Sequence, residues 1–406
     1  MKKPEILAPA GNLDKLKVAI DFGADAVYLG GSRLNLRAFA DNFSNEDLIE
    51  GVKYAHERGR KVYVTLNVFP HNNDLKGIDS YIKELNDMNV DAVLVSDPAI
   101  FMAVKEAAPD LEIHISTQAN NVNYKSAQFW YKLGAKRIVL ARELSLTEIK
   151  EIREKLDDKC DLEAFVHGSM CISYSGRCLL SNYMTGRDAN RGACAQACRY
   201  KYALVEEKRQ GEYYPIVEDE NGAYIMNSKD LCMIEHIDDV IKAGVYSLKI
   251  EGRMKSAYYV AAVVKSYRQA VDAYLKDPDN YKFDPKWMEN LNRVSHRKYT
   301  TGFYYGAEDK QIYESSSYIR SADIIGIVRD FDEKNMIATI EQKNKVLNGD
   351  EVEVLRPEGD NFKIKLNDMC EKNGTPIDSA PRAQMIYKVT VDKKLKIKDL
   401  LIKAKN

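Results

Sequence analysis

The 406-residue chain lacks several features that would each define a class of protein. It has no apolar run near the roughly 18 residues that a membrane helix needs. Neither charge is in excess, because 60 Lys and Arg residues stand against 61 Asp and Glu residues. Any surface for nucleic acid must therefore be a local patch. Residues 1–4 lead into strand-like sequence without the apolar segment of a secretory signal, so we expect a cytoplasmic protein with no membrane partner.

Familiar catalytic motifs are also missing from the chain. It contains no Gly-x-Ser-x-Gly, no His-Glu-x-x-His and no P-loop sequence. No Gly-x-Gly-x-x-Gly follows the first expected strand, which disfavours a dinucleotide-binding open sheet. A serine or zinc peptidase of familiar type thus has no support from motifs.

Short apolar segments alternate with amphipathic helical patterns over the first 275 residues. The segments are rich in Val, Ile and Leu, as strands buried on both faces should be. Ser44 and Ser145 fit helix N-caps, and Gly59 and Gly134 fit helix ends. Eight β–α units predict an α/β fold with a closed (β/α)8 TIM-like barrel, and a doubly wound open sheet is the alternative. The expected strands are Ile6–Ala8, Ala26–Leu29, Lys61–Leu66, Ala92–Ser96, Glu112–Ser116, Arg137–Ala141, Leu162–Val166 and Ser247–Ile250.

The unit after the seventh strand contains an insertion, residues 168–228, before an expected helix over 230–243. An insertion of that length at the carboxyl end of a strand is usually functional. The barrel domain then spans 1–276, and a helical, aromatic connector spans 277–320. Over 321–406 five short alternating segments with turn residues between them predict a small antiparallel β-barrel.

Four of the seven cysteines stand within 28 residues, namely Cys171, Cys178, Cys194 and Cys198. Thiolates from separate loops can enclose a metal ion or an iron–sulfur cluster. The spacing contains no Cys-x-x-Cys, which most structural zinc sites use at least once. An iron–sulfur cluster, most fittingly of the 4Fe–4S type, is therefore favoured over structural zinc or inert cysteines. Cys232 is close enough in sequence to replace one ligand.

Polar residues follow the strands at the ends that would share one face of the barrel. Arg37, Arg142 and Arg253 stand at three separate strand ends. A guanidinium group pairs well with a carboxylate, so these arginines indicate an anionic small molecule. Asn67 and Gln118 are further candidates for substrate binding.

Two residues after the last two strands are candidate catalytic groups. His167 follows the seventh strand and Glu251 follows the eighth, where acid–base groups of such barrels lie. His167 could instead be a structural histidine, and Glu251 could form an internal ion pair with Arg253.

Basic and aromatic residues interleave near the cysteines, at Arg187, Arg191, Arg199 and Tyr200. Cations for phosphates and rings for unstacked bases are how single-stranded RNA loops are bound. A solvated charged surface would have the same composition, so both interpretations stay open.

Four segments resemble the collagenase-like, unclassified-mechanism peptidase family: Glu5–Asn12, Gly23–Gly30, Glu163–Ser181 and Lys249–Arg253. The resemblance spans nearly the whole chain. Within this family the chain is most similar to the tRNA hydroxylation proteins. These use prephenate to convert the wobble uridine to 5-hydroxyuridine without oxygen, and they share the pair that stands here as Cys198-Arg199.

The resemblance implies a tRNA hydroxylase with tRNA as partner and prephenate as co-substrate. It also implies a 4Fe–4S cluster on the four clustered cysteines, inserted by the iron–sulfur assembly machinery. Two other functions stay open. One is a peptidase of the collagenase-like family, and the other is an RNA-binding accessory protein with a structural cluster.

Overall fold

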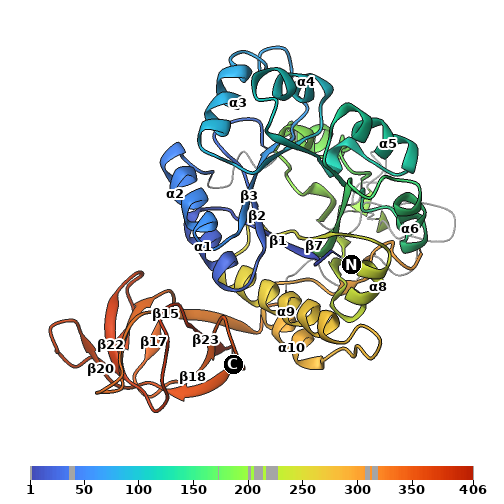
Figure 1. Ribbon diagram of the computed structural model, residues 1–406. Helices are drawn as coiled ribbons and strands as arrows, with labels where there is room; N and C mark the ends of the chain where they lie inside the picture. The colour runs from blue at the N-terminus through green and yellow to red at the C-terminus, as the bar shows by residue number, and fades with distance from the viewer. Residues whose placement is uncertain are drawn as a thin grey trace.

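Eight parallel strands form a closed barrel, which Figure 1 shows as a ring surrounded by helices. β1 (Glu5–Pro9) pairs with β2 (Ala26–Leu29) and with β12 (Ser247–Ile250). β12 also pairs with β7 (Asp161–Ser169), which closes the ring. The prediction of a TIM-like barrel is confirmed, because all eight expected strands lie in it. The remaining strands are β3 (Lys61–Leu66), β4 (Ala92–Val95), β5 (Glu112–Ile115) and β6 (Arg137–Val139).

The structure is a computed structural model. It describes residues 2–35, 42–171, 173–199, 203–204, 214–215, 227–306, 311–312 and 319–405. Arg37 and Tyr200, two predicted site residues, lie outside the described residues. No helix in the described ranges is long and apolar enough to cross a membrane.

The outer helices begin and end largely where the sequence predicts. The Ser44 hydroxyl accepts a hydrogen bond from the Asp47 amide, and Ser145 forms a capping box with Glu148. Gly134 ends its helix with a positive φ of 109°, a conformation that glycine adopts without strain. The helices are α1 (Leu13–Asp21), α2 (Asn45–His56), α3 (Ile78–Asp87), α4 (Pro98–Ala107), α5 (Tyr124–Leu133), α6 (Leu146–Glu154), α8 (Ile237–Lys242), α9 (Ala257–Lys276) and α10 (Pro285–Arg293).

The chain after β7 departs from the repeating pattern. The insertion contains α7 (Leu180–Thr185) and two short 3-10 helices, η2 (Ala189–Arg191) and η3 (Ala197–Arg199). β11 (Asp230–Cys232) then pairs antiparallel with the end of β7, and β13 (Tyr299–Thr300) pairs with β11.

The expected helix over 230–243 is therefore wrong in its first part. β7 has nine residues and β6 has three, so β7 extends beyond its neighbour. The extension leaves backbone N–H and C=O groups that need partners, and β11 supplies them. Only Ile237–Lys242 of the expected helix is α-helical.

The C-terminal unit is an antiparallel, curled sheet beside the barrel, drawn in orange to red in Figure 1. Its strand order is β19-β18-β23-β15-β16-β22-β20. The alternating pattern predicted five of these strands and missed β20 and β23. Lys398 Nζ lies 2.9 Å from Asp21 on α1, so charged contacts tie the sheet to the barrel. The strands are β15 (Ala322–Asp332), β16 (Ile337–Gln342), β18 (Glu351–Leu355), β19 (Phe362–Lys365), β20 (Asn367–Glu371), β22 (Ile386–Thr390) and β23 (Leu400–Ala404).

Candidate active site: a cysteine-lined pocket on the barrel

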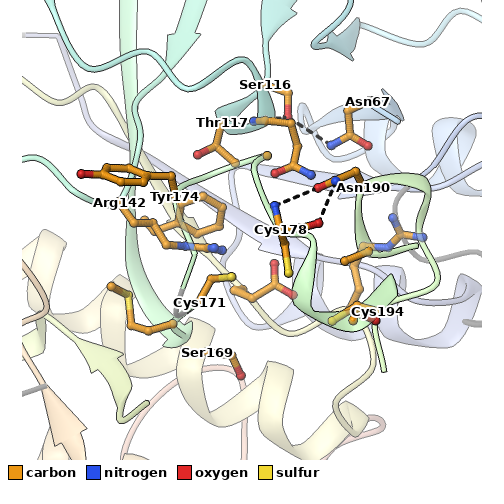
Figure 2. Close-up of a pocket in the computed structure, with 18 of the residues that line it drawn as sticks. Asn67, Ser116, Thr117, Arg142, Ser169, Cys171, Tyr174, Cys178, Asn190 and Cys194 are labelled. Carbon is orange, nitrogen blue, oxygen red and sulfur yellow. Dashed lines mark hydrogen bonds between the residues drawn. The ribbon is translucent and has the colours of Figure 1, made fainter. Parts of the chain in front are cut away.

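A cavity of about 180 Å³ lies between the carboxyl ends of the barrel strands and the insertion. We call it the inner pocket. In Figure 2, Cys171, Cys178 and Cys194 stand around it together with polar residues that follow β3, β5 and β6. Nine of the residues that the sequence nominated line this one cavity. They are Asn67, Gln118, Arg142, Cys171, Cys178, Cys194, Cys198, Glu251 and Arg253.

Close backbone packing holds the insertion over the barrel. Gly176 has a φ of 74°, and a Cβ at this position would lie 2.2 Å from the carbonyl oxygen of Gln118. Only glycine fits that approach. On the other side, Arg191 Nη2 lies 2.7 Å from Asp74 Oδ2 in the loop after β3. These contacts fix the cysteines relative to the strand ends.

Hydrogen bonds also orient the cysteine-bearing loops themselves. The Gln196 amide donates to Cys194 Sγ at 3.4 Å. Desolvation raises the pKa of the Cys171 thiol, and the charge of Arg142 opposes this rise. Cys171, Cys178 and Cys194 line the same cavity.

The donor set fits an iron–sulfur cluster in its chemistry, because four thiols line one cavity. In the part of the chain that the structure describes, no three Cys, His, Asp or Glu side chains already stand as a metal-binding group. Cys232 lies on β11 outside the inner pocket and is 6% exposed. Burial raises its pKa to about 12, so it behaves as an apolar residue. The placement gives no support to Cys232 as a replacement ligand.

Positive side chains line the inner pocket on several sides. The Arg142 guanidinium lies over the ring of Phe165 at 3.8 Å, and no carboxylate of the described residues forms an ion pair with it. Arg253 is 3% exposed and donates to Asn42 Oδ1 at 3.0 Å. Asn67 donates to Ser116 Oγ at 3.1 Å, while its Oδ1 has no partner within the described ranges. The arginines offer positive charge to a small polar molecule.

Lys249 forms part of the pocket floor, and the sequence analysis did not nominate it. It lies on β12, and it lines the cavity together with Glu251, which follows the strand. Its Nζ lies 2.6 Å from Glu163 Oε1 and 4.4 Å from the centre of the Tyr28 ring. Tyr28 in turn donates to Glu251 Oε2 at 3.1 Å.

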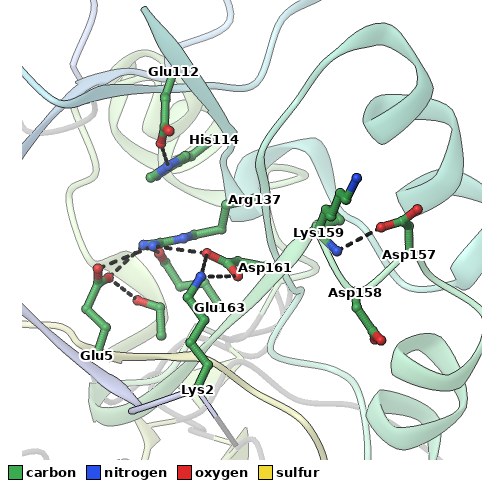
Figure 3. A network of polar contacts seen from close by, with 12 residues as sticks. Lys2, Glu5, Glu112, His114, Arg137, Asp157, Asp158, Lys159, Asp161 and Glu163 are labelled. Carbon is green, nitrogen blue, oxygen red and sulfur yellow. Dashed lines mark hydrogen bonds and ion pairs between the residues drawn. The ribbon is translucent and has the colours of Figure 1, made fainter.

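Below the floor, the barrel interior holds a buried ion network, shown in Figure 3. Arg137 Nη1 lies 2.7 Å from Glu5 Oε1 and 3.1 Å from Glu163 Oε2. Glu163 also pairs with Lys249, so the network contains two cations and two carboxylates. Burial raises the pKa of Glu5, but Arg137 outweighs this effect and lowers the pKa to about 2. Burial likewise opposes ionisation of Glu163, and the charges of Lys249 and Arg137 lower its pKa overall. Lys249 is therefore held in place from below.

His167 does not lie with the pocket residues. It is 1% exposed, and its ring packs against Tyr259, Tyr267 and Tyr299 at centroid distances of 5.4–5.9 Å. Desolvation lowers its pKa to about 3, so the ring is neutral.

A β-bulge explains this orientation of His167. Phe165 pairs with Lys249, but the next residue of β12, Ile250, pairs with His167 instead of Val166. The extra residue reverses the inward–outward alternation of β7. This placement corrects the expectation that His167 faces the pocket with the other strand ends, whereas Glu251 does face it.

Two residues nominated for RNA binding, Arg187 and Arg191, lie in the described part of the insertion with their side chains. Arg187 donates to the backbone carbonyls of Ala193 and Cys194, at 3.1 and 3.5 Å. Arg191 pairs with Asp74, and the structure describes Arg199 by its backbone only. Exposed apolar residues on the same segment, Leu179 at 74% and Tyr183 at 91%, were missed because their sequence resembles an ordinary helical face.

Fold and site together define a TIM-like barrel protein with a cysteine-lined pocket at the carboxyl ends of its strands. Residues 11–314 match peptidase family U32, and residues 320–401 match the peptidase family U32 C-terminal domain. The chain belongs to peptidase family U32.

Curated relatives in this family carry two kinds of name. The chain is 43% identical to tRNA hydroxylation protein P1 of Bacillus subtilis, over 100% of this chain and 96% of the relative. It is 40% identical to tRNA hydroxylation protein P of Escherichia coli, over 94% of this chain and 92% of the relative. A protein of Porphyromonas gingivalis named collagenase is 36% identical, over 74% of this chain and 73% of the relative.

Proposed function

We propose that the protein is a tRNA-modifying enzyme. It hydroxylates the wobble uridine to 5-hydroxyuridine, independently of oxygen, with prephenate as co-substrate. The names of the full-length relatives support tRNA hydroxylation. The observation that carries the finer proposal is that four cysteines and three cations, Arg142, Lys249 and Arg253, line one cavity. The cavity thus combines ligands for a redox centre with groups that bind carboxylates.

The cysteines are proposed to hold a 4Fe–4S cluster. A bound cluster would supply one-electron transfer next to the cavity. The chain contributes the fixed loops that present the four thiols: Gln196 donates to Cys194, and Gly176 allows close packing on the barrel. Arg142 lies near enough to Cys171 to interact with its charge, and it would partly balance a negative cluster.

Prephenate carries two carboxylates, and the inner pocket has cations for both. Arg142 has no ion pair among the described residues, so its guanidinium fork can take one carboxylate. Lys249 and Arg253 lie deeper and are held by neighbours, which fixes them as donors for the other. Asn67 also lines the cavity, and its amide Nδ2 donates to Ser116 Oγ at 3.1 Å.

The proposed reaction is tested by expression in a bacterial strain that lacks its own tRNA hydroxylation genes. Mass spectrometry of digested tRNA should show 5-hydroxyuridine with the wild-type chain and none with an empty vector. The product should disappear when the strain cannot make prephenate. If tRNA from the complemented strain lacks 5-hydroxyuridine, the proposal is wrong.

Replacement of single cysteines tests the cluster. After anaerobic purification we expect about four irons per wild-type chain. We expect a large loss of iron with Cys178→Ser or Cys194→Ser. Cys370→Ser is the matched control, because Cys370 lies in the C-terminal sheet. Full iron content in both Cys178→Ser and Cys194→Ser would refute the ligand assignment.

The family name and the relative named collagenase favour one alternative, a peptidase. The described residues that line the inner pocket include serines and cysteines but no histidine to activate them. Digestion of gelatin by the purified chain, with no effect on tRNA nucleosides, would establish this alternative.

A further inference from the structure

A second chamber of about 200 Å³ adjoins the inner pocket, and we call it the outer chamber. The two share one wall, and Figure 2 shows three of its residues, Arg142, Cys171 and Tyr174, together on one side of the inner pocket. Met170 also lines both cavities. Among the described residues, four more line the outer chamber and not the inner pocket: Glu143, Ser173, Ser175 and Phe303.

The outer chamber is small and partly aromatic. Its volume is close to that of the inner pocket, so the choice of ligand depends on the side chains that line it. The rings of Phe303 and Tyr174 and the thioether of Met170 line the chamber. Tyr174 is 66% exposed, so one side of the chamber opens to solvent and a ring on a longer molecule can enter.

Charged residues of opposite sign, Arg142 and Glu143, both line this chamber. The Ser175 amide and hydroxyl donate to Glu143 Oε1 at 2.7 and 3.2 Å, which fixes the carboxylate. Its Oε2 receives one long contact of 3.4 Å from the same hydroxyl and keeps acceptor capacity. The neighbouring Arg142 supplies N–H donors. An acceptor beside a donor matches the edge of uracil, where N3–H stands between two carbonyl oxygens.

We propose that the outer chamber binds an unstacked uracil base of RNA, while the inner pocket binds the anionic co-substrate. This assignment rests on the proposed tRNA function. Phe303 and Tyr174 stack on the base, as aromatic residues do in proteins that bind extruded nucleotides. Glu143 accepts from N3–H and disfavours cytosine, whose N3 is itself an acceptor. Arg142 and Cys171 stand where the two ligands meet.

The test uses the full-length, cluster-loaded protein and three RNA hairpins of an anticodon arm, bound under anaerobic conditions. One carries uridine at the wobble position, one cytidine and one an abasic ribonucleotide. Fluorescence anisotropy should show about tenfold weaker binding of the abasic hairpin to the wild type, since one stacked base is lost. Phe303→Ala should weaken binding of the uridine hairpin by a similar factor and should leave binding of the abasic hairpin unchanged. Glu143→Gln should narrow the preference for uridine over cytidine.

Phe129→Ala is the matched control, since Phe129 is an exposed phenylalanine on α5, 55% accessible, away from both cavities. Unchanged prephenate affinity of Phe303→Ala, measured by calorimetry, shows that the inner pocket is intact. If wild type binds the uridine and abasic hairpins equally, or if Phe303→Ala weakens both equally, the chamber assignment is overturned and the tRNA function stands. If wild type binds none of the hairpins, the proposed function itself fails.

Discussion

The side chain of Asn190 holds both backbone polar groups of Cys178. Its Oδ1 accepts from the Cys178 amide at 3.3 Å, and its Nδ2 donates to the Cys178 carbonyl at 2.8 Å. The backbone of Asn190 is itself tied to the barrel, because its carbonyl accepts from the Phe69 amide at 3.3 Å. One residue therefore connects a proposed cluster ligand to the loop after β3.

Asn190→Ala should loosen Cys178 without removing any thiol. Two hydrogen bonds to a partly buried backbone are lost, so we expect a cost of about 1–3 kcal/mol in the free energy of unfolding. Iron per chain after anaerobic purification should fall clearly, and the remaining cluster should be lost faster in air. Asn335→Ala removes a comparable amide contact, to Asp332, far from the pocket, and should keep full iron content. Equal iron in both variants would mean that Asn190 does not position Cys178.

His167→Gln tests whether this buried histidine is structural. The pKa of His167 is lowered to about 3 by burial, against 6.5 in an unfolded chain. As the pH falls below 6.5, His167 becomes protonated in the unfolded chain but stays neutral in the folded chain. The folded protein therefore loses stability between pH 6.5 and 3, by up to about 1.4 kcal/mol per pH unit. Urea unfolding at pH 7, 6, 5 and 4 should show a shallower decline for the variant.

The same variant separates structure from catalysis. Because His167 lies outside the inner pocket, we expect His167→Gln to form 5-hydroxyuridine at the wild-type rate per folded, iron-loaded molecule. If the variant is folded and iron-loaded but makes no product, His167 takes part in catalysis.

Much of the scaffold could be predicted because it depends on local sequence. Alternation of apolar segments and capped helices defines eight β–α units, and closure of the barrel then brings their polar ends together. For this reason Asn67, Gln118 and Arg142, far apart in sequence, share a cavity with the cysteines.

The rest depends on pairings between distant segments, which leave no local pattern. The bulge that turns His167 outward arises where β7 meets β12, and Val166-His167 looks like ordinary strand sequence. β11 forms because β7 is longer than β6, a property of two strands together. Lys249 was overlooked because a lysine inside a strand is usually exposed, and its partner Glu163 stands 86 residues earlier.

Arg137→Met should destabilise the barrel strongly. The substitution removes the cation that Glu5 and Glu163 share, so both carboxylates lose an ion pair. Breaking a buried ion pair in this way lowers the free energy of unfolding by about 3–5 kcal/mol. The double variant Glu5→Gln with Arg137→Met removes one charge of each sign and keeps Glu163 paired with Lys249. Urea unfolding should show that the double variant recovers a substantial part of the loss. Equal stability of the single and double variants would contradict a coupled network.

The pH dependence of the free energy of unfolding at acid pH offers a second measurement on this network. Glu5 has a pKa of about 2 in the folded chain, against 4.5 as its ordinary value. Its contribution is thus complete above pH 4.5 and is lost as pH falls toward 2, because protonation removes the ion pair with Arg137. Glu5→Gln should flatten the stability curve in this range.

Arg142→Ala should separate ligand binding from folding. The side chain contributes a contact with the Phe165 ring, worth about 0.5–1 kcal/mol, and has no ion pair among the described residues. Unfolding in urea should therefore change little. A charge-assisted bond to a carboxylate contributes about 1.5–3 kcal/mol, so calorimetry should show roughly tenfold or greater loss of prephenate affinity. Arg329→Ala, which breaks a surface pair with Glu341 on the C-terminal sheet, should bind prephenate as the wild type does. If Arg142→Ala binds prephenate with wild-type affinity, the anion does not contact Arg142.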